Sequence, residues 1–534
     1  MNGNIHIGHL AGYLLPADIF ARFHRFIGND VLMVSGSDCF GTPITVEADK
    51  RGVLPKEIVN EYHKKAATLF RDLGISYDIY TKTDTENHKK IAQEFFLALL
   101  EKGYVFKGIT KEYYSETDKK FLPDRYVEGE CANCGFGAAR SDQCDNCGKV
   151  LGEGDLKNPK SKLSQNVLSL KETEHYFLDW PKLEPFLKKY FSEKGGRWRD
   201  WVRRETEGWL NQGLKPRAIT RDIDWGVPLP IEKIPKDKLI EGAPGKRLYV
   251  WFEAVIGYFS ASLEWATGRG EPEKWREWWQ NEEAEHYYFM GKDNLVFHAL
   301  FWPGEIYGYN ETFNLPDSPV INHFLSIDGK QFSKSRGVII DSREITEKYG
   351  NDPVRFYLVS IMPETTDANF TWESFWGTNN NILIANFGNF IMRTLTLSEG
   401  LNLKGELVAE AAEKEAKSAL QRAKDALIEA RFKEYVQAIL DLSDFGNKYL
   451  ARTEPWKIKK ENLDEFEAIV SSGVYLVLVL LALLKPLLPE TYEKLSRMTG
   501  VSFDRWPSEK ELIRAVSDVR VKNLAPLFRK IENT

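Results

Sequence analysis

The chain has 534 residues, of which 43% are hydrophobic and 28% charged, so it is a globular sequence too long for one core, and we expect two to four domains. Its 72 basic and 78 acidic residues leave a formal charge of −6, which argues against non-specific coating of nucleic acid but not against a local basic face. Five cysteines in so long a chain exclude a disulfide framework and indicate a reducing, cytoplasmic location.

Two histidines, His6 and His9, stand close to the start of the chain, on either side of Ile7-Gly8. The apolar residues from Leu10 to Phe20 follow the spacing of one helix face. The histidines are therefore expected at a helix N-terminus, where unpaired N–H groups favour a polyphosphate. Taken alone, the motif is also compatible with a turn that carries two solvated histidines.

Residues 1–104 alternate helical segments with short apolar strands. A strand is predicted at 31–34, and helices are predicted at 55–73 and 85–102. This alternation predicts a doubly wound, Rossmann-like parallel sheet that binds its ligands at the carboxyl ends of the strands. Asp38 follows the first strand closely, so its carboxylate is suited to hold an ammonium group or to cap a helix.

An insertion from 105 to 225 interrupts this alternation. At about 128–150 it carries two Cys-x-x-Cys pairs, each followed by a glycine. Four thiolates complete a tetrahedral zinc site with no open position, whereas a redox dithiol would need only one pair. We therefore expect one structural Zn²⁺, bound by Cys131, Cys134, Cys144 and Cys147.

The α/β pattern resumes at 226–343, with a strand-like segment at 248–252. It ends in a cation-rich loop, Asp328 to Gly337, that reads DGKQFSKSRG. In this order, the histidine pair and the loop predict an ATP site with a donor group at each end of the triphosphate. After a linking region at 344–377, residues 378–534 form a helical bundle.

The longest apolar run, Val474 to Leu484, has 11 residues. A membrane span needs about 20 residues, so we interpret this run as a buried helix of the bundle and expect no membrane partner.

The histidine pair and the Lys-Ser loop resemble the HIGH and KMSKS signatures of class I aminoacyl-tRNA synthetases, and the surrounding residues resemble the methionyl-tRNA synthetase family. The likeness covers essentially the whole chain, and it continues through residues 35–38, 41–44, 121–125, 219–222, 249–254 and 291–303.

The resemblance implies a ligase that activates L-methionine with Mg²⁺-ATP and transfers the methionyl group to the 3′ end of elongator and initiator tRNA(Met). It implies a catalytic domain at 1–104 and 226–343, a stem-contact region at 344–377, and an α-helical anticodon-binding domain at 378–534. The alternatives are a class I synthetase for another apolar amino acid and a non-catalytic tRNA-binding protein on a truncated scaffold. The large editing insertion of the isoleucyl, leucyl and valyl enzymes is absent from the sequence.

Site residues follow from the same resemblance. Those implied in catalysis are His6, His9 and Lys334, and ATP binding adds Asn4, Gly8, Lys292, Asp293, Ser333 and Ser335. Aromatic walls suit a polarizable thioether, although such residues could also be core. The implied methionine-binding residues are Asp38, Arg221, Trp251, Tyr258, His298 and Phe301.

Recognition of tRNA is implied at two places. Asn389, Arg393 and Trp456 match residues that read the CAU anticodon, where indole stacking and Arg hydrogen bonds suit unpaired bases. Trp456 could instead cap the bundle. The segment from Arg197 to Arg221 carries seven basic residues among three tryptophans, and we expect either a tRNA acceptor surface or a solvated helix face.

The sequence departs from the family pattern at Cys39, Phe40, Val255 and Gln331. Gln331 stands where the first lysine of the loop signature is usual, beside Lys330. Relatives place an apolar strand before the Asn2-Gly3 position, and such a strand needs about five residues. We therefore expect the natural protein to begin upstream of Met1.

Overall fold

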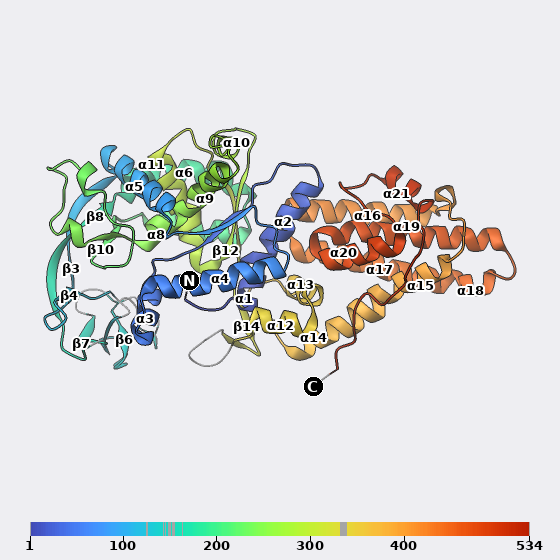
Figure 1. Cartoon of the computed structure of the whole chain (residues 1–534), viewed down its shortest axis with the longest axis horizontal. Coiled ribbons are helices and arrows are strands. Elements are labelled where there is room, and N and C mark those ends of the chain that lie inside the picture. Colours follow the sequence, from blue (N-terminus) through green and yellow to red (C-terminus); the bar gives the residue numbers. More distant parts are fainter. Residues whose placement is uncertain are drawn as a thin grey trace.

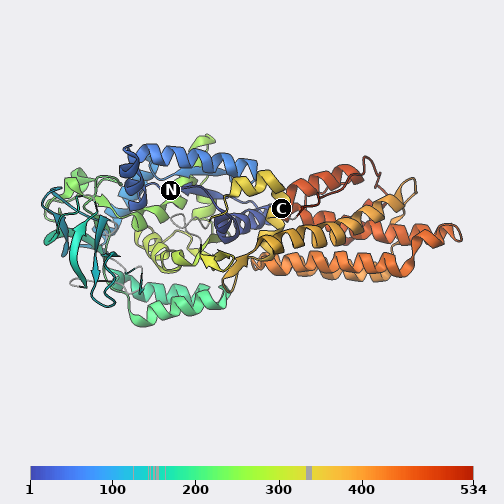
Figure 2. The same cartoon turned by 90° about the horizontal axis from the view of Figure 1, so that it is seen from below.

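The computed structural model describes residues 2–123, 126–141, 144, 146–147, 151, 155–162, 164–331 and 339–532. A strand-rich insertion and a helical bundle lie at opposite ends of the molecule, with an α/β body between them (Figure 1). The bundle extends from the body as a rod, which is also visible in the perpendicular view (Figure 2). The predicted fold class is confirmed.

The histidine pair begins a continuous helical stretch. α1 (Ile7–His9) passes into a π-helical segment, η1 (Leu10–Leu14), and then into α2 (Leu15–Phe26). The apolar side chains of this stretch are buried in the main core, as their spacing predicts. The N-terminal end of the stretch is therefore held by the packing of everything that follows it.

The parallel strands of the α/β body occur as two pairs. β1 (Val34–Ser37) pairs with β2 (Ile79–Lys82), and β12 (His286–Gly291) pairs with β13 (Pro316–Asn322). The two pairs belong to separate sheets. The expectation that a further strand precedes Asn2 stays an expectation.

The helices predicted at 55–73 and 85–102 are confirmed as α4 (Pro55–Asp72) and α5 (Glu86–Glu101). Local capping explains both N-termini: the Glu57 carboxylate accepts from the Leu54 N–H at 3.0 Å, and the Thr85 hydroxyl accepts from the His88 N–H at 3.2 Å. The other long helices of the body are α3 (Thr42–Arg51), α9 (Gly257–Gly268) and α11 (Trp302–Tyr309).

Two strand predictions need correction. The strand predicted at 31–34 begins only at Val34, because the Asp78 side chain accepts from the Met33 N–H at 2.7 Å in place of a ladder partner. Of the segment 248–252, only Leu248 is a strand residue, at the end of β11 (Arg247–Leu248). Val250–Glu253 forms a helical turn, α8, since the N–H groups of Phe252 and Glu253 both donate to the Tyr249 carbonyl.

The insertion is built on a long antiparallel ladder between β3 (Val105–Ser115) and β8 (Ser169–Leu178). β4 (Lys120–Phe121) and β9 (Arg217–Ala218) complete its four-stranded sheet. A second sheet carries the cysteines and consists of β5 (Val127–Cys131), β6 (Ala139–Arg140) and β7 (Leu156–Ser161). Two helices return the chain to the body: α6 (Trp180–Lys194) and α7 (Asp200–Gln212).

A small sheet joins the base of the Lys-Ser loop to the linking region. β14 (Leu325–Ile327) pairs with β15 (Lys330–Gln331) on one side and with β16 (Ala368–Phe370) on the other. The linking helices are α12 (Ser342–Tyr349), α13 (Asn351–Ser360) and α14 (Trp372–Gly377).

The bundle surrounds α19 (Leu463–Leu487). Among the described helices, this one is long and apolar enough to cross a membrane, but 89% of its most apolar window is buried. It is therefore the core helix of the bundle, as predicted for Val474 to Leu484. Around it lie η10 (Thr378–Gly388), α15 (Asn389–Ser398), α16 (Glu410–Ile428), α17 (Phe432–Thr453), α18 (Pro455–Ile458), α20 (Pro489–Thr499) and α21 (Glu509–Val516).

A buried ion pair joins the bundle to the helix that follows the histidines. Arg355 of α13 donates to the Asp18 carboxylate of α2 at 2.6 Å and to the carbonyl of Leu487, the last residue of α19, at 2.9 Å. Asp18 is fully buried, and Arg355 is 1% exposed. Burial opposes ionisation of Asp18, but Arg355 and Arg22 together hold its pKa below the usual value.

Candidate functional site

The two histidine rings lie close together at the start of α1, with their planes tilted by 30°. Their centroids are 3.7 Å apart, and the His6 backbone N–H donates to His9 Nδ1 at 3.1 Å. Because Nδ1 accepts this bond, the proton of a neutral His9 lies on Nε2. The pair thus offers a ring donor beside the helix N-terminus, an arrangement that suits phosphate oxygens.

Backbone hydrogen bonds hold the histidine motif against the residues that follow the Lys-Ser loop. The Ile7 N–H donates to the Ile340 carbonyl at 3.2 Å, and the Ser342 N–H donates to the Ile5 carbonyl at 3.1 Å. The Asn4 side chain donates to the Asp341 carboxylate at 2.8 Å. The histidine motif and the segment that follows the Lys-Ser loop, more than three hundred residues apart in sequence, therefore meet at one place in the fold.

Ser333, Lys334 and Ser335 themselves lie outside the described residues. Both flanks of their loop are described. β15 leads into it from the β14 ladder, and the segment from Ile340 to Ser342 leads out of it beside the histidines. The exit from the loop is therefore hydrogen-bonded to the histidine motif, and its entry is held by the β14 ladder.

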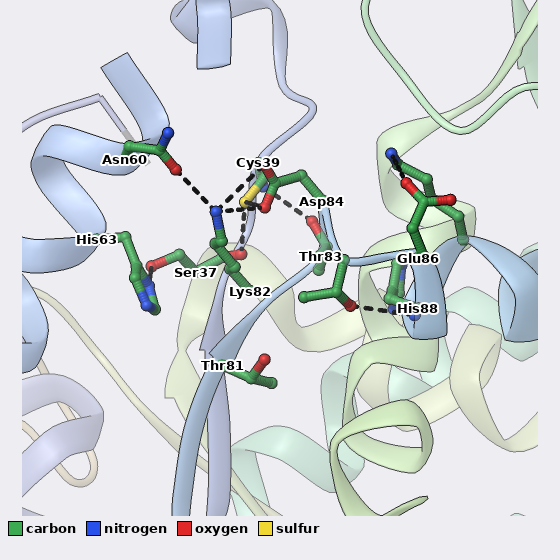
Figure 3. Close-up of polar contacts among 12 residues, drawn as sticks. Ser37, Cys39, Asn60, His63, Thr81, Lys82, Thr83, Asp84, Glu86 and His88 are labelled. Carbon is green, nitrogen blue, oxygen red and sulfur yellow. Dashed lines mark hydrogen bonds and ion pairs between the residues drawn. The ribbon is translucent and has the colours of Figure 1, made fainter. Parts of the chain in front are cut away.

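The carboxyl ends of β1 and β2 carry a group of polar side chains (Figure 3). The Lys82 ammonium lies between Asn60, at 2.7 Å, and the Asp84 carboxylate, at 3.1 Å. Asp38 follows β1 directly, and its Oδ1 accepts from the Phe40 N–H at 3.2 Å. A carboxylate at this edge of the sheet is suited to bind an α-ammonium group.

Cys39 and Phe40, which depart from the family pattern, are core residues. Burial raises the pKa of the Cys39 thiol to about 12, so the thiol is neutral. The Cys39 carbonyl accepts a hydrogen bond from Trp225 Nε1 at 2.6 Å, and the Phe40 ring packs on the same indole with ring centroids 5.3 Å apart. Their role is to fix the backbone on which Asp38 sits.

Trp251 and Phe301 line one pocket. Trp251 stacks on Phe297 with centroids 4.2 Å apart, and Phe301 stacks on Trp180 at the same separation. The pocket is walled by Leu178, Trp180, Arg217, Ala218, Ile219, Tyr249, Trp251, Phe252, Phe297, Phe301 and Glu305. Most of this wall is aromatic or aliphatic, but the enclosed space of about 10 Å³ is smaller than a methionine side chain.

Tyr258 and His298 form a second part of the predicted methionine site. The Tyr258 hydroxyl lies 2.8 Å from His298 Nε2, and His298 Nδ1 lies 3.0 Å from the Asn294 carbonyl. Since only a protonated Nδ1 can donate to a carbonyl, Nε2 accepts from Tyr258. Burial lowers the pKa of His298 to about 4 and raises that of Tyr258, so both are neutral. Neither lines the Trp251 pocket.

Arg221 lies in β10 (Thr220–Arg221) and stacks on Tyr249, with the guanidinium carbon 4.2 Å from the ring centroid. Its guanidinium donates to the carbonyls of Ala218 and Thr220 at 3.1 and 2.8 Å. The side chain is thus folded back against the wall of the Trp251 pocket.

A buried charge cluster anchors this wall, and sequence reasoning missed it. His175 of β8 lies 2.9 Å from the Thr220 hydroxyl and 3.2 Å from the Asp222 carboxylate. Asp222 also accepts from Lys246, which is 2% exposed, at 2.7 Å. Because strands far apart in sequence supply these residues, periodicity gives no signal for them. The Asp in Thr220-Arg221-Asp222 was the only visible hint.

The predicted ribose and phosphate residues follow β12. Lys292 donates to the Asp367 carboxylate of the linking region at 2.7 Å. Asp293 accepts from the Asn294 side chain at 3.2 Å, and burial raises its pKa. Gly8 lies within α1, between the histidines. Asp293 therefore lies at the carboxyl end of a parallel strand, while Lys292 has an ion-pair partner as it stands.

The four cysteines converge as predicted. All four sulfur atoms lie within 4.8 Å of one another, with Cys131 and Cys147 at 3.9 Å and Cys134 and Cys144 at 3.6 Å. Tetrahedral zinc with Zn–S bonds of about 2.3 Å needs sulfur atoms about 3.8 Å apart. The donor set therefore fits one Zn²⁺.

Asn389, Arg393 and Trp456 lie in the bundle, on α15 and α18. The Arg393 guanidinium lies 5.1 Å from the Trp456 ring centroid, and the Asn389 side chain donates to Asn447 at 3.4 Å. Trp456 is 42% exposed, which is unlike an indole that caps a core. α18 lies towards the end of the bundle that is remote from the histidines (Figure 1).

The basic segment from Arg197 to Arg221 divides between two roles. Arg199 is internal: its guanidinium donates to the carbonyls of Ile321 and Ala430 at 2.8 and 3.0 Å, and burial lowers its pKa. Trp198 is buried, whereas Trp209 is 42% exposed. Part of this segment therefore packs the insertion against the body and does not form a basic surface available to tRNA.

Comparison with known proteins agrees with this geometry. The family described as "tRNA synthetases class I (M)" matches residues 1–395, and the family described as "Anticodon binding domain of methionyl tRNA ligase" matches residues 405–534. In fold and sequence the chain is thus a class I aminoacyl-tRNA synthetase. Within that class, it belongs to the methionyl family.

Individual relatives cover nearly the whole chain. The methionine–tRNA ligase of Thermobifida fusca is 43% identical over 517 residues, which cover 93% of this chain and 84% of that protein. That of Thermomicrobium roseum is 42% identical over 510 residues, covering 93% and 85%. The crystal structure of Mycobacterium tuberculosis methionyl-tRNA synthetase bound by methionyl-adenylate superposes with a TM-score of 0.77 at 21% identity, covering 99% of this chain and 98% of that one.

Proposed function

We propose that this protein activates L-methionine with Mg²⁺-ATP and transfers the methionyl group to tRNA(Met), elongator and initiator, in the cytoplasm. One observation carries the proposal: in a chain of the methionyl family, the histidine motif is hydrogen-bonded to the segment that leaves the Lys-Ser loop. On this proposal, a histidine ring donor and the Lys334 cation act on one triphosphate.

Two substitutions make up the reaction. A methionine carboxylate oxygen attacks the α-phosphorus, the bond to the β-phosphate oxygen breaks, and pyrophosphate leaves. A hydroxyl of the terminal adenosine of tRNA then attacks the methionyl carbonyl, loses its proton, and displaces AMP. His6, His9 and Lys334 stabilise charge on the phosphates, while Asn4, Gly8, Lys292, Asp293, Ser333 and Ser335 hold the nucleotide.

Methionine lies between the ammonium-binding carboxylate of Asp38 and the aromatic wall. The side chain of the substrate meets Trp251, Tyr258, His298 and Phe301, and Arg221 borders the same region. Since the Tyr258–His298 pair is neutral, this region carries no charge that would compete with Asp38 for the amino group.

Two further groups of residues bind the tRNA anticodon and stabilise the insertion. Asn389, Arg393 and Trp456 read the CAU anticodon, with the exposed indole as a stacking platform. The four cysteines hold one Zn²⁺, which cross-links the second sheet of the insertion and takes no part in the chemistry.

The test is aminoacylation of a tRNA transcript that carries a CAU anticodon, with methionine, leucine, isoleucine and valine supplied separately. Methionine alone should be transferred at a substantial rate. If another apolar amino acid were transferred at a comparable rate, the protein would not be specific for methionine. If the protein bound tRNA but transferred no amino acid, the proposed enzymatic activity would be wrong.

A further inference from the structure

Lys292 and Asp367 form an ion pair between the α/β body and the linking region. The Lys292 ammonium donates to Asp367 Oδ1 at 2.7 Å, and the same oxygen accepts from the Phe324 backbone N–H at 2.9 Å. Lys292 follows β12 directly, whereas Asp367 immediately precedes β16. One carboxylate oxygen thus joins three segments that are distant from one another in sequence.

The position of Lys292 makes this ion pair relevant to the candidate ATP site. Lys292 lies at the carboxyl end of a parallel strand, where open α/β sheets bind their ligands, and Asp293 is the next residue. Burial, Tyr80 and Asp293 raise the pKa of Tyr13, and the Tyr13 ring packs on His9 with centroids 5.8 Å apart. The turn that begins at Lys292 is therefore within electrostatic reach of the histidine motif.

The Lys292 ammonium is held from two sides. Burial opposes ionisation of Asp367, but hydrogen bonds from Lys292 and from the Phe324 N–H hold its pKa below the usual value, so the carboxylate is charged. The ammonium also lies over the Phe324 ring, 4.4 Å from its centroid. The Lys292 and Asp367 side chains are 29% and 52% exposed, so a ligand can still reach the ammonium.

The backbone that leads to Asp367 is anchored by the body, the insertion and the bundle. In the body, β16 pairs with β14. From the insertion, Trp201 Nε1 donates to the Glu364 carbonyl at 3.0 Å. From the bundle, the Phe432 N–H donates to the Glu364 carboxylate at 2.6 Å. Asp367 thus projects from a well-anchored segment, whereas a free lysine side chain has several rotatable bonds and is costly to immobilise.

We propose that Asp367 is a positioning residue for ATP, whose carboxylate holds the Lys292 ammonium where it binds the nucleotide. The inference rests on the proposed function, in which Lys292 belongs to the ATP site. An ammonium has three N–H donors, so the bond to Asp367 leaves two of them for oxygen atoms of the ligand. A partner that fixes the ammonium beforehand lowers the entropy lost when ATP binds. If the carboxylate instead neutralised Lys292, its removal would strengthen ATP binding, so the two explanations predict opposite signs.

The experiment separates the charge of Asp367 from its structural contact. Methionine-dependent pyrophosphate exchange gives the KM for ATP and for methionine in the wild type, Asp367→Asn, Lys292→Met and the double variant. Asparagine keeps an oxygen that can accept from the Phe324 N–H but loses the charge that holds the ammonium. Asp367→Asn should raise the KM for ATP by about three- to tenfold, the factor for one hydrogen bond of ordinary net strength, and leave the KM for methionine unchanged. Because Asp367 acts through Lys292, the same change should add little in the Lys292→Met background.

Glu61→Gln is the matched control, because the Glu61 carboxylate on α4 also accepts from basic side chains, those of Arg51 and Lys65, at 2.7 Å each. It should leave both KM values near those of the wild type. An unchanged or lower KM for ATP in Asp367→Asn, an equal rise in the KM for methionine, or an undiminished effect in the Lys292→Met background would overturn the inference alone. A wild type without methionine-dependent exchange would overturn the proposed function, and this inference with it.

Discussion

Burial determines the protonation of single side chains around the amino-acid site. The Ser260 hydroxyl donates to the Gly257 carbonyl at 3.2 Å, so it accepts from His88 Nδ1 at 2.9 Å. His88 Nε2 must then accept from Glu253 at 2.8 Å, which requires a protonated carboxyl. The pKa values agree, because burial lowers that of His88 to about 3 and raises that of Glu253.

For single residues, Lys334 gives the clearest distinction between an effect on the rate of activation and an effect on methionine affinity. As a cation for the phosphates, it acts mainly in the transition state, so Lys334→Ala should slow activation on the order of 10²-fold or more while methionine affinity barely changes. Pre-steady-state adenylate formation and equilibrium methionine binding measure the two effects. Equal losses in both would mean that the loop is structural.

At the scale of elements, β9 and β10, which form part of the wall of the Trp251 pocket, are stabilised by the buried cluster of His175, Asp222 and Lys246. Burial opposes a charged His175, but hydrogen bonds to Asp222 and Glu112 raise its pKa above the ordinary value. The stabilisation is therefore complete below the unfolded pKa of about 6.5, and it is lost as the pH rises through the folded pKa.

His175→Gln should accordingly cost more stability at pH 6 than at pH 9. Urea unfolding of the wild type and the variant at both pH values gives the difference, in which groups common to both proteins cancel. A cost that is equal at the two pH values would show that His175 acts by shape and not by charge.

The cysteine sheet should depend on its metal. Removal of Zn²⁺ with a chelator should unfold the small core around Cys131 and Cys144, because β5 and β7 bury few other apolar side chains. Metal analysis should find about one zinc per chain before treatment. A metal-free protein with unchanged melting and activity would contradict a structural role.

Local patterns predicted the elements that local physics determines. α4 and α5 carry their own caps and apolar faces, and the two Cys-x-x-Cys pairs carry their own ligand spacing. The histidine pair and the aromatic residues were recognised by motif. In contrast, the late start of β1 depends on Asp78, and the role of His175 depends on partners far along the chain. Contacts of that kind leave no trace in periodicity.

Over the described part of the molecule, a shared core and the Asp18–Arg355 ion pair help to connect the bundle to the candidate ATP site. α19 runs the length of the bundle and ends at Leu487, whose carbonyl accepts from Arg355, and Arg355 also binds Asp18 in the helix behind the histidines. The distal end of the bundle carries α18 with Trp456, so the proposed anticodon site is physically separate from the candidate ATP site.

This separation predicts a split phenotype for Trp456→Ala. Loss of one stacked base should cost roughly 1–3 kcal/mol of tRNA binding, so aminoacylation should slow while adenylate formation continues at its normal rate. Phe445→Ala, in a half-buried ring of α17, serves as a comparison for general damage to the bundle. If aminoacylation and adenylate formation fell together in the Trp456 variant, that residue would be a packing residue.

The central claim is that the histidine motif and the Lys-Ser loop form one methionine-activating site. Methionine-dependent exchange of labelled pyrophosphate into ATP tests it most directly, with the wild type beside His9→Ala. The account predicts exchange that requires methionine and that falls by on the order of 10²-fold in the variant. Exchange that is absent from the wild type, or equally fast in His9→Ala, would contradict it.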